Sequence, residues 1–405
     1  MPFDASRPAA VAAASRWMLP CLCTGAFLVF AQTFMVAPLI PQLAELFHSP
    51  VAWVGLAIPA YIVPEAVATL GVGPLSDRVG RNGVILGSLL AFIILTVLTA
   101  TSRHVGTFIG WRIITGVAAA GIVPISLTLI GDVVPFTQRG RAVGYLFGSI
   151  AGGTATGAAV GALMEPLIGW RALFLVVALM AAALVVVMIV ASVLPHLARP
   201  ARAQPWSAVL RGYGRLLGLA RARRTYGYVL LNAILQSGVF TWLGVYLHER
   251  FGLSETGIGL VLLGYGIPGM LFGPIIGKLA DRYGRSIIVP TGVVLTGACA
   301  LALAASPPLY GVRVAIILLS LGFDLTHPQL AAIATDLGGG RGQAVALMAF
   351  SLFCGFGIGS LLFQAALALG FVGAFVAFGV AALIGAAVAF RLFRAERPRT
   401  AAAGR

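Results

Sequence analysis

Apolar stretches about as long as a membrane-spanning helix alternate with short polar segments along the whole chain. A helix needs about 20 apolar residues to cross a bilayer, and only helices or closed barrels satisfy their backbone groups in lipid. These stretches do not alternate polar and apolar residues as barrel strands do. They fall at 18–40, 51–73, 84–101, 108–131, 142–164, 172–194, 226–247, 256–277, 287–305, 311–335, 343–369 and 373–392. The pattern predicts an all-α membrane protein with twelve transmembrane helices.

Two segments that lie 204 positions apart in the 405-residue chain are nearly alike. GPLSDRVGR begins at Gly73, and GKLADRYGR begins at Gly277. Further pairs at the same offset are Pro124 and Pro328, Asp132 and Asp336, and Gly169 and Gly373. Because six spans separate the copies, the repeat is parallel, about an axis along the membrane normal. We therefore expect two pseudo-symmetric six-helix bundles, with a cavity between them that rocking exposes to either side in turn.

Arginines are concentrated in alternate loops, and loops rich in basic residues stay on the cytoplasmic side. Both termini and the one long polar linker should therefore be cytoplasmic. We expect the basic amphipathic stretch from Trp206 to Leu219 to lie on the membrane surface as a helix. The expected divisions are a cytoplasmic N-terminus (1–17), a first bundle (18–194), the linker (195–225), a second bundle (226–392) and a cytoplasmic tail (393–405).

The composition agrees with a membrane protein and excludes other classes. Hydrophobic residues make up 60% of the chain and charged residues 10%, whereas a soluble domain carries about 25% charged residues. The net charge of +15 lies in the loops, so we expect no nucleic-acid partner. The sequence has no Walker motif, no Cys-x-x-Cys pair and no His-rich cluster, so we expect no ATP hydrolysis, no metal and no cofactor.

The repeated motif Gly-x-Leu-x-Asp-Arg-x-Gly-Arg resembles the signature of the major facilitator superfamily. Arg112-x-x-x-Gly116 in span four and Trp170-Arg171 before span six are similar to further motifs of that family, so the resemblance covers essentially the whole chain. Span five resembles the glycine-rich motif associated with antiporters. Its glycines are Gly144, Gly153, Gly157 and Gly161, with Ala158 where that motif has proline. These glycines either only pack the bundle closely or form a hinge-like interface between the halves.

The resemblance implies a cytoplasmic gate built from both copies of the motif. Asp77 would dock on the start of span eleven and Asp281 on the start of span five, where a helix N-terminus stabilises a carboxylate. Glycines in the motif would allow close backbone approach or positive φ. Alternatively, these loops only fix the orientation. The candidate gate residues are Gly73, Asp77, Arg78, Gly80, Arg81 and Asp132 in the first half and Gly277, Asp281, Arg282, Gly284, Arg285 and Asp336 in the second.

Ionisable groups inside the spans are candidates for proton coupling. A charge at mid-bilayer costs about 2.5–3.5 kcal/mol or more, so such groups face water or a partner. Glu65 lies in span two, Arg112 in span four and Asp324 in span ten. His327 shares a helix face with Asp324 through its i,i+3 spacing. The alternatives are that the carboxyl groups only stabilise packing and that Arg112 only anchors its helix at the interface.

The resemblance also implies that spans one, four, seven and ten line the substrate cavity. The candidate lining residues are Gln32, Thr33, Asn232, Gln236, Trp242, Asp324 and His327, together with the aromatics Phe240 and Tyr246. Gln32-Thr33 stands where many proton-coupled drug exporters carry an acid, so coupling would fall to Glu65 or Asp324. Alternatively, the amides of span seven only join helices.

These features predict a secondary active transporter for a small amphipathic or weakly cationic organic molecule. Our main hypothesis is proton antiport, and hence efflux of drugs or metabolites, by a monomer in a bacterial inner membrane. Its partners would be the substrate, protons and lipid. An uptake permease, working by symport or facilitated diffusion, is the alternative within transport. A non-transporting sensor or scaffold is the alternative of another class. The chain shows no motif of an enzyme.

Overall fold

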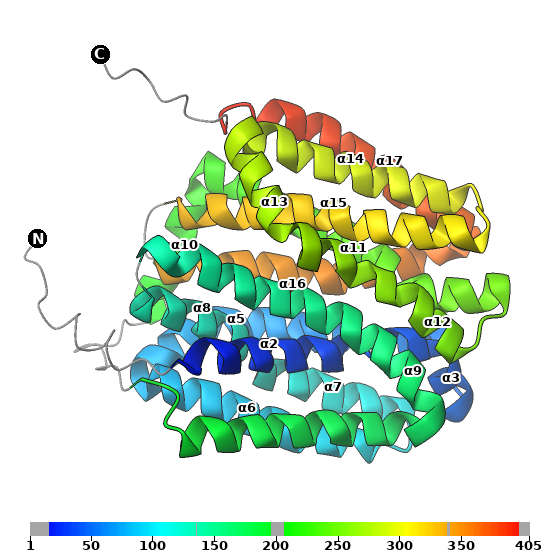
Figure 1. The fold of residues 1–405 in the computed structure, drawn as a ribbon, viewed down its shortest axis with the longest axis horizontal. Coiled ribbons are helices and arrows are strands. Elements are labelled where there is room, and N and C mark those ends of the chain that lie inside the picture. Colours follow the sequence, from blue (N-terminus) through cyan, green and yellow to red (C-terminus); the bar gives the residue numbers. More distant parts are fainter. Residues whose placement is uncertain (1–15, 135, 196–205, 338–340, 397–405) are drawn as a thin grey trace, which may run out of the picture.

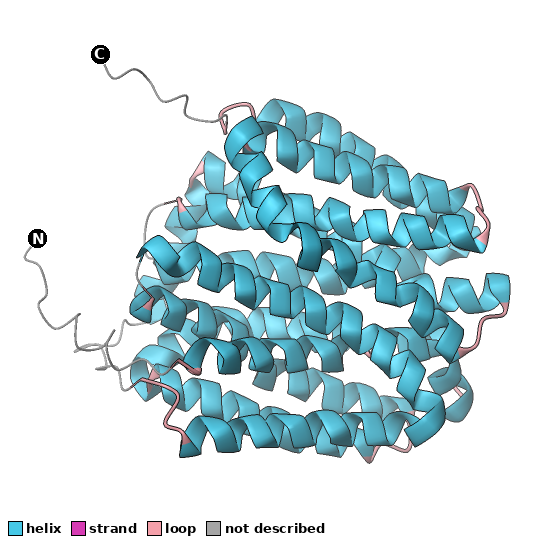
Figure 2. Ribbon diagram, viewed as in Figure 1, coloured by secondary structure: helices cyan, strands magenta, loops and turns pink. Residues whose placement is uncertain are grey.

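The computed structural model describes residues 16–134, 136–195, 206–337 and 341–396. For some residues in these ranges it describes the backbone alone, among them 136–141, 277, 281, 335, 341 and 342. Every regular element in these ranges is a helix (Figure 2). The first half holds α2 (Met18–Phe34), η1 (Ala37–Leu39), α3 (Ile40–Leu46), α4 (Val51–Gly55), α5 (Pro59–Val79), α6 (Arg81–Ala100), α7 (Val105–Ala119), α8 (Ile122–Val133) and α9 (Phe136–Val190). The linker holds α10 (Trp206–Gly218). The second half holds α11 (Ala220–Phe251), α12 (Glu255–Leu262), η2 (Leu263–Gly266), α13 (Ile267–Tyr283), α14 (Arg285–Ala304), α15 (Leu309–Thr335), α16 (Arg341–Ala366), η3 (Leu367–Leu369) and α17 (Gly370–Leu392).

Nine stretches among the described residues are long and apolar enough to cross a membrane. Two of them, Gly144–Val190 and Gln343–Leu392, have 47 and 50 residues and cross twice. They fold back at Gly169 and Gly370, whose φ angles of +78° and +72° favour glycine. Each of these two hairpins counts as two crossings, and α12, η2 and α13 together form one further span. The twelve predicted spans are therefore all present. The helices run side by side, and α2 begins at the same end of the bundle where α17 ends (Figure 1).

The predicted repeat is visible in the helix boundaries. α6 and α14 both begin and end 204 residues apart, and α7 and α15 begin 204 apart. Gly80 and Gly284, which end α5 and α13, have matching φ angles of +95° and +84°. The register shifts only near the last hairpins, where the counterpart of Gly169 is Gly370. The predicted pairing of Gly169 with Gly373 is therefore wrong.

The two halves meet where α5 lies against α16 and where α9 lies against α12 and α13. Three predicted glycines pack α9 within its own half. A Cβ atom at Gly153 or Gly157 would lie 2.4 Å from a backbone oxygen of α2, and one at Gly161 would lie 2.7 Å from that of Met35, the residue after α2. The neighbouring face of α9 meets the other half, since a Cβ at Gly259 of α12 would lie 2.8 Å from the carbonyl oxygen of Ala159. Gly144 has open space around it, so its assignment to the packing motif is wrong.

The linker helix α10 joins the two halves. Its buried face consists of Val209, Tyr213 and Leu216. The Tyr213 hydroxyl donates to the carbonyl of Leu70 in α5 over 3.1 Å, and Gly212 lies against Gln343 of α16. The predicted helix exists, and its apolar face packs on protein at the seam between α5 and α16, while its position on the membrane surface stays a prediction.

Candidate functional site

A buried arginine in the first half binds the broken parts of spans one and two. Prolines break span one after α2 and span two before α5, which leaves backbone carbonyls without their helical donors. Arg112 of α7, which is fully buried, donates to the Ala57 and Thr33 carbonyls over 3.0 Å each. It also donates to the Gln32 carbonyl over 3.3 Å and to its side-chain oxygen over 2.7 Å. Gln32 and Thr33 thus accept hydrogen bonds from Arg112, and their place in the substrate cavity stays a prediction.

Glu65 lies next to this arginine without an ion pair to it. The residue is 2% exposed, and its Oε1 atom has no hydrogen-bond partner among the described residues. None of the ion pairs among the described residues joins it to Arg112, whose guanidinium lies instead over the ring of Tyr61 at 4.5 Å. A carboxyl group in such a place is costly unless it binds a proton or meets a ligand.

The structure separates the predicted pair of Asp324 and His327. Asp324 accepts a hydrogen bond from Ser320 over 3.3 Å and faces α13, where a Cβ at Gly269 would lie 3.0 Å from its Oδ2 atom. His327 points to the seam between the halves, with its ring stacked on Phe323 at 5.1 Å and 5.4 Å from Phe147 of α9. Neither ring nitrogen of His327 has a partner in the described structure. The i,i+3 spacing is real, but the two side chains contact different helices.

The candidates on α11 have different environments. Gln236 donates to the hydroxyl of Tyr265, while both amide atoms of Asn232 are buried without a partner among the described residues. The indole of Trp242 donates to the Ser360 carbonyl over 3.1 Å. Its ring packs on Gly55 of α4, where a Cβ would lie 2.7 Å from it. Trp242 therefore contacts both halves, and its assignment to the cavity lining stays a prediction.

Phenylalanine rings fill the centre between the halves. Phe34 of α2 lies 5.8 Å from Phe240 and 6.1 Å from Phe356 across the seam. We call this group the central aromatic cluster; its members are Phe30, Phe34, Phe240, Tyr265, Phe323, Phe353 and Phe356. Sequence reasoning found only Phe240, because apolar rings in a span look the same whether they face lipid, core or substrate. The i,i+4 spacing of Phe30 and Phe34 was the available signal.

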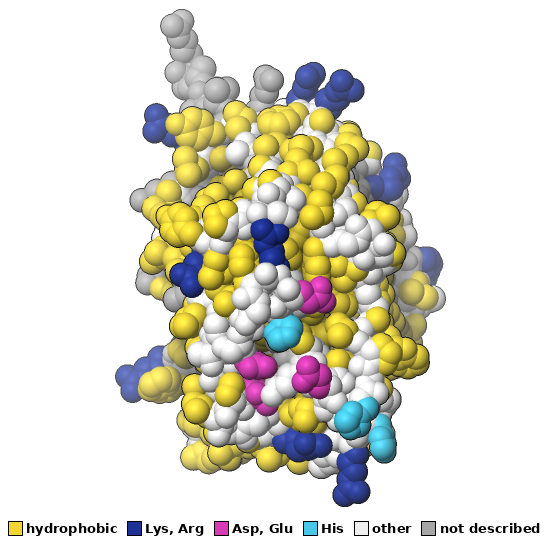
Figure 3. All heavy atoms as spheres, turned by 90° about the vertical axis from the view of Figure 1, so that its right-hand side faces the viewer, with side chains coloured by type: hydrophobic (Ala, Val, Ile, Leu, Met, Phe, Trp, Pro, Cys, Tyr) yellow, Lys and Arg dark blue, Asp and Glu magenta, His cyan; other side chains and the backbone are white. Residues whose placement is uncertain are grey.

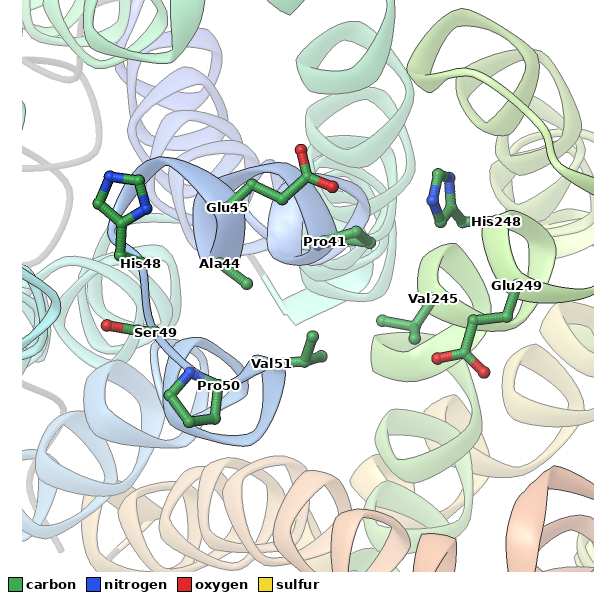
Figure 4. Close-up of a pocket in the computed structure, with 10 residues that line it drawn as sticks. All are labelled: Pro41, Ala44, Glu45, His48, Ser49, Pro50, Val51, Val245, His248 and Glu249. Atoms are coloured by element: carbon green, nitrogen blue, oxygen red, sulfur yellow. The ribbon is translucent and has the colours of Figure 1, made fainter.

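A cleft of about 470 Å³ opens between the halves at the end of the molecule opposite the start of α2 and the end of α17. Acidic residues and histidines gather on this face (Figure 3). Figure 4 shows Glu45 and His48 on the first half, opposite His248 and Glu249 on α11. The other residues that line the cleft are Pro41, Ala44, Ser49, Pro50, Val51 and Val245. We call this the outer cleft; no sequence motif marked it.

The gate motif is helical rather than a loop, because α5 continues to Val79 and one glycine, Gly80, makes the turn. The Nε atom of Arg81 lies 2.7 Å from Asp132, and in the second half Arg285 lies 3.8 Å from Asp336. These two ion pairs are equivalent in the repeat.

The remaining gate residues differ. Arg78 lies 5.6 Å from the ring of Trp206 in α10, and Arg282 lies 5.4 Å from that of Tyr283. Gly73 has neither a close neighbour nor positive φ, so its expected role is wrong. The surroundings of Gly277, the side chain of Asp281 and the side chains at the starts of α9 and α16 lie outside the described part of the structure, so the docking of Asp77 and Asp281 stays a prediction.

Comparisons with known proteins agree with this architecture. The family model described as Major Facilitator Superfamily matches residues 22–337 and 229–404. The uncharacterized MFS-type transporter YwfA of Bacillus subtilis (strain 168) is 29% identical over 280 residues, which cover 67% of this chain and 66% of that protein. A chloramphenicol resistance protein of Streptomyces lividans is 25% identical over 333 residues, or 81% of this chain and 83% of that protein. The solved structure of the human organic anion transporter MFSD10 (TETRAN) matches with a TM-score of 0.73 at 18% identity. The match covers 92% of this chain and 99% of that one, and at this identity it supports a shared fold alone.

Proposed function

Because this chain belongs to the Major Facilitator Superfamily, we propose that it is a proton-coupled exporter of a small organic molecule that works by alternating access. The observation that carries the proposal is the buried carboxyl group of Glu65, which has no hydrogen bond at Oε1 and no ion pair with the neighbouring Arg112. Glu65 would take up a proton from the outer side and release it to the cytoplasm. The charge left behind would favour binding of the next substrate molecule.

The central aromatic cluster supports an apolar substrate with at least one ring. Aromatic rings favour other rings and cations through their faces. The unpaired amide of Asn232 could donate and accept one hydrogen bond each. With Glu65 and Asp324 nearby, the site favours neutral or cationic molecules over anions. The relative from Streptomyces lividans, named as a chloramphenicol resistance protein, makes chloramphenicol the first molecule to test.

The two ends of the molecule support the proposed cycle. The outer cleft lies between the halves at one end, and at the other end α10 bridges α5 and α16. Rocking about the central cluster would close the cleft and part the bridged ends. We propose that the α10 end is cytoplasmic, because the basic loops lie there, and that the protein acts as a monomer in a bacterial inner membrane, without a cofactor.

Transport by the purified protein in proteoliposomes tests the proposal. With an acidic interior, protons leave as substrate enters, so we expect radiolabelled chloramphenicol to accumulate several-fold over vesicles whose gradient is collapsed by an ionophore. Glu65→Gln should remove the dependence on the gradient, while Glu45→Gln at the outer cleft is a matched control. Equal uptake by the wild-type protein with and without the gradient would contradict proton coupling.

Uptake rather than export is the second candidate. It is favoured by Ala158, which is fully buried in α9 where the antiporter motif has proline. The direction of transport in everted vesicles separates the two: a permease would carry its substrate towards the cytoplasmic side under the same gradient.

A further inference from the structure

Helix boundaries in spans two and four of the first half recur in spans eight and ten of the second half. α5 and α13 end at Val79 and Tyr283, and α7 and α15 begin at Val105 and Leu309, each pair 204 residues apart. The same offset pairs Tyr61-Ile-Val-Pro64-Glu65 with Tyr265-Gly-Ile-Pro268-Gly269. The boundaries of the helices thus fix which residues of the two halves are equivalent.

This register makes Gly269 the counterpart of Glu65 and Ala120 the counterpart of Asp324. Gly269 has no side chain, and the space beside it holds the carboxyl group of Asp324, 3.0 Å from where a Cβ atom would lie. In the first half, span two supplies the acid and span four supplies a small residue. In the second half, span ten supplies the acid and span eight supplies the small residue.

The surroundings of the two acids repeat as well. Tyr61 and Arg112 are the titratable and charged neighbours of Glu65, and Tyr265 is the titratable neighbour of Asp324. Gln32 and Gln236, also 204 apart, bind Arg112 and Tyr265 respectively. Arg112 itself is not repeated: its counterpart is Ile316, which is apolar and fully buried.

We infer that each half holds one exchangeable-proton site at the same place of the repeat. Glu65 supplies the carboxyl group of this site in the first half, and Asp324 supplies it in the second half. Gly269 is then a positioning residue, because only a residue without a side chain leaves room for Asp324. The inference rests on the proposed proton coupling and adds to it that the protein carries two acid sites, one in each bundle.

Moving the acid from one helix to the other tests this equivalence. Asp324→Ala with Gly269→Glu rebuilds in the second half the arrangement of Ala120 and Glu65. Asp324→Ala with Gly269→Gln has nearly the same volume without the carboxyl group and is the matched control. Infrared difference spectra of the purified full-length protein between low and high pH report buried carboxyl groups without any substrate.

We expect the wild-type protein to show two buried carboxyl signals, one lost in Glu65→Gln and the other in Asp324→Ala. The Asp324→Ala, Gly269→Glu variant should regain the lost signal and, in proteoliposomes, the dependence of chloramphenicol transport on the pH gradient; the glutamine control should regain neither. The inference fails if the glutamate variant behaves like the glutamine control, or if Asp324→Ala loses no signal. A wild-type protein with both signals whose transport ignores the gradient would instead overturn the proposed coupling.

A stability measurement gives a second test. Gly269→Ala should lower the melting temperature of the wild-type protein, because the new Cβ crowds the Asp324 carboxyl group, and should have little effect when Asp324→Ala has emptied that space. Equal destabilisation in both backgrounds would show that Gly269 does not serve to leave room for the Asp324 carboxyl group.

Discussion

At the scale of single residues, the site depends on buried polar groups that differ in how well they are paired. Arg112 has four acceptors within hydrogen-bond distance, whereas Glu65 and His327 have buried polar atoms without a partner in the described structure. The sequence indicated all three, because ionisable residues in apolar spans stand out. It could not distinguish their roles, since the acceptors of Arg112 are mostly backbone carbonyls exposed by proline breaks in two other spans. We therefore propose that Arg112 has a structural role and that Glu65 carries the proton.

Arg112→Lys should destabilise the protein strongly. A lysine ammonium cannot reach acceptors on two helices as a planar guanidinium does, and each buried carbonyl left without a donor costs about 1–3 kcal/mol. We expect a large drop in the melting temperature of the purified protein. Arg171→Lys is the control, because Arg171 donates to a single carbonyl, that of Ser102. Equal melting temperatures of the two variants would contradict the structural role.

Glu396 should make stability depend on acid pH. Hydrogen bonds from Arg221, and then from Arg224, hold the pKa of its carboxyl group below the usual value and tie the end of the second bundle to the start of α11. The ionised form stabilises the fold above the ordinary glutamate pKa of about 4.3, and this contribution is lost as the pH falls through the lowered value. Glu396→Gln should melt lower than the wild type at pH 7, with the difference shrinking in acid; a constant difference would refute this.

At the scale of the helices, breaks and close contacts position the site. Span two is divided into α4 and α5, and span eight into α12, η2 and α13. Glycines bring α9 onto α2 and α16 onto α11, because a Cβ at Gly157 or Gly359 would lie 2.4 Å from a backbone oxygen. The sequence predicted the spans and the glycine row. It did not predict that α5 extends through the gate motif, because polar residues at the end of a helix read as a loop.

Gly157→Ala is the smallest change that tests this packing. Its Cβ would meet the backbone of Ala31 in α2, which can yield only if the helices move apart. Overpacking of this kind costs about 1–3 kcal/mol, so we expect a lower melting temperature and poorer expression. Gly144→Ala, on the same helix but in open space, should behave like the wild-type protein. Equal effects of the two substitutions would show that the contact does not limit packing.

At the scale of the whole molecule, a six-helix unit is present twice, and its two copies meet along α5 with α16 and α9 with α12. The doubling was readable from two copies of one motif, and helix boundaries 204 residues apart confirm it. The central aromatic cluster and the outer cleft were not readable, because each combines residues from both halves that no local pattern connects. The bridge made by α10 was missed for the same reason: an amphipathic helix shows its apolar face but not what covers it.

The central claim is that a proton on a buried acid decides how the two halves sit relative to each other. Spin labels on His48→Cys and His248→Cys, with the four native cysteines replaced, report the width of the outer cleft by electron paramagnetic resonance and also remove both histidines from its lining. We predict that the distance distribution shifts with pH in the otherwise wild-type protein and becomes independent of pH in Glu65→Gln. A cleft that opens and closes with pH equally well without the Glu65 carboxyl group would contradict the account.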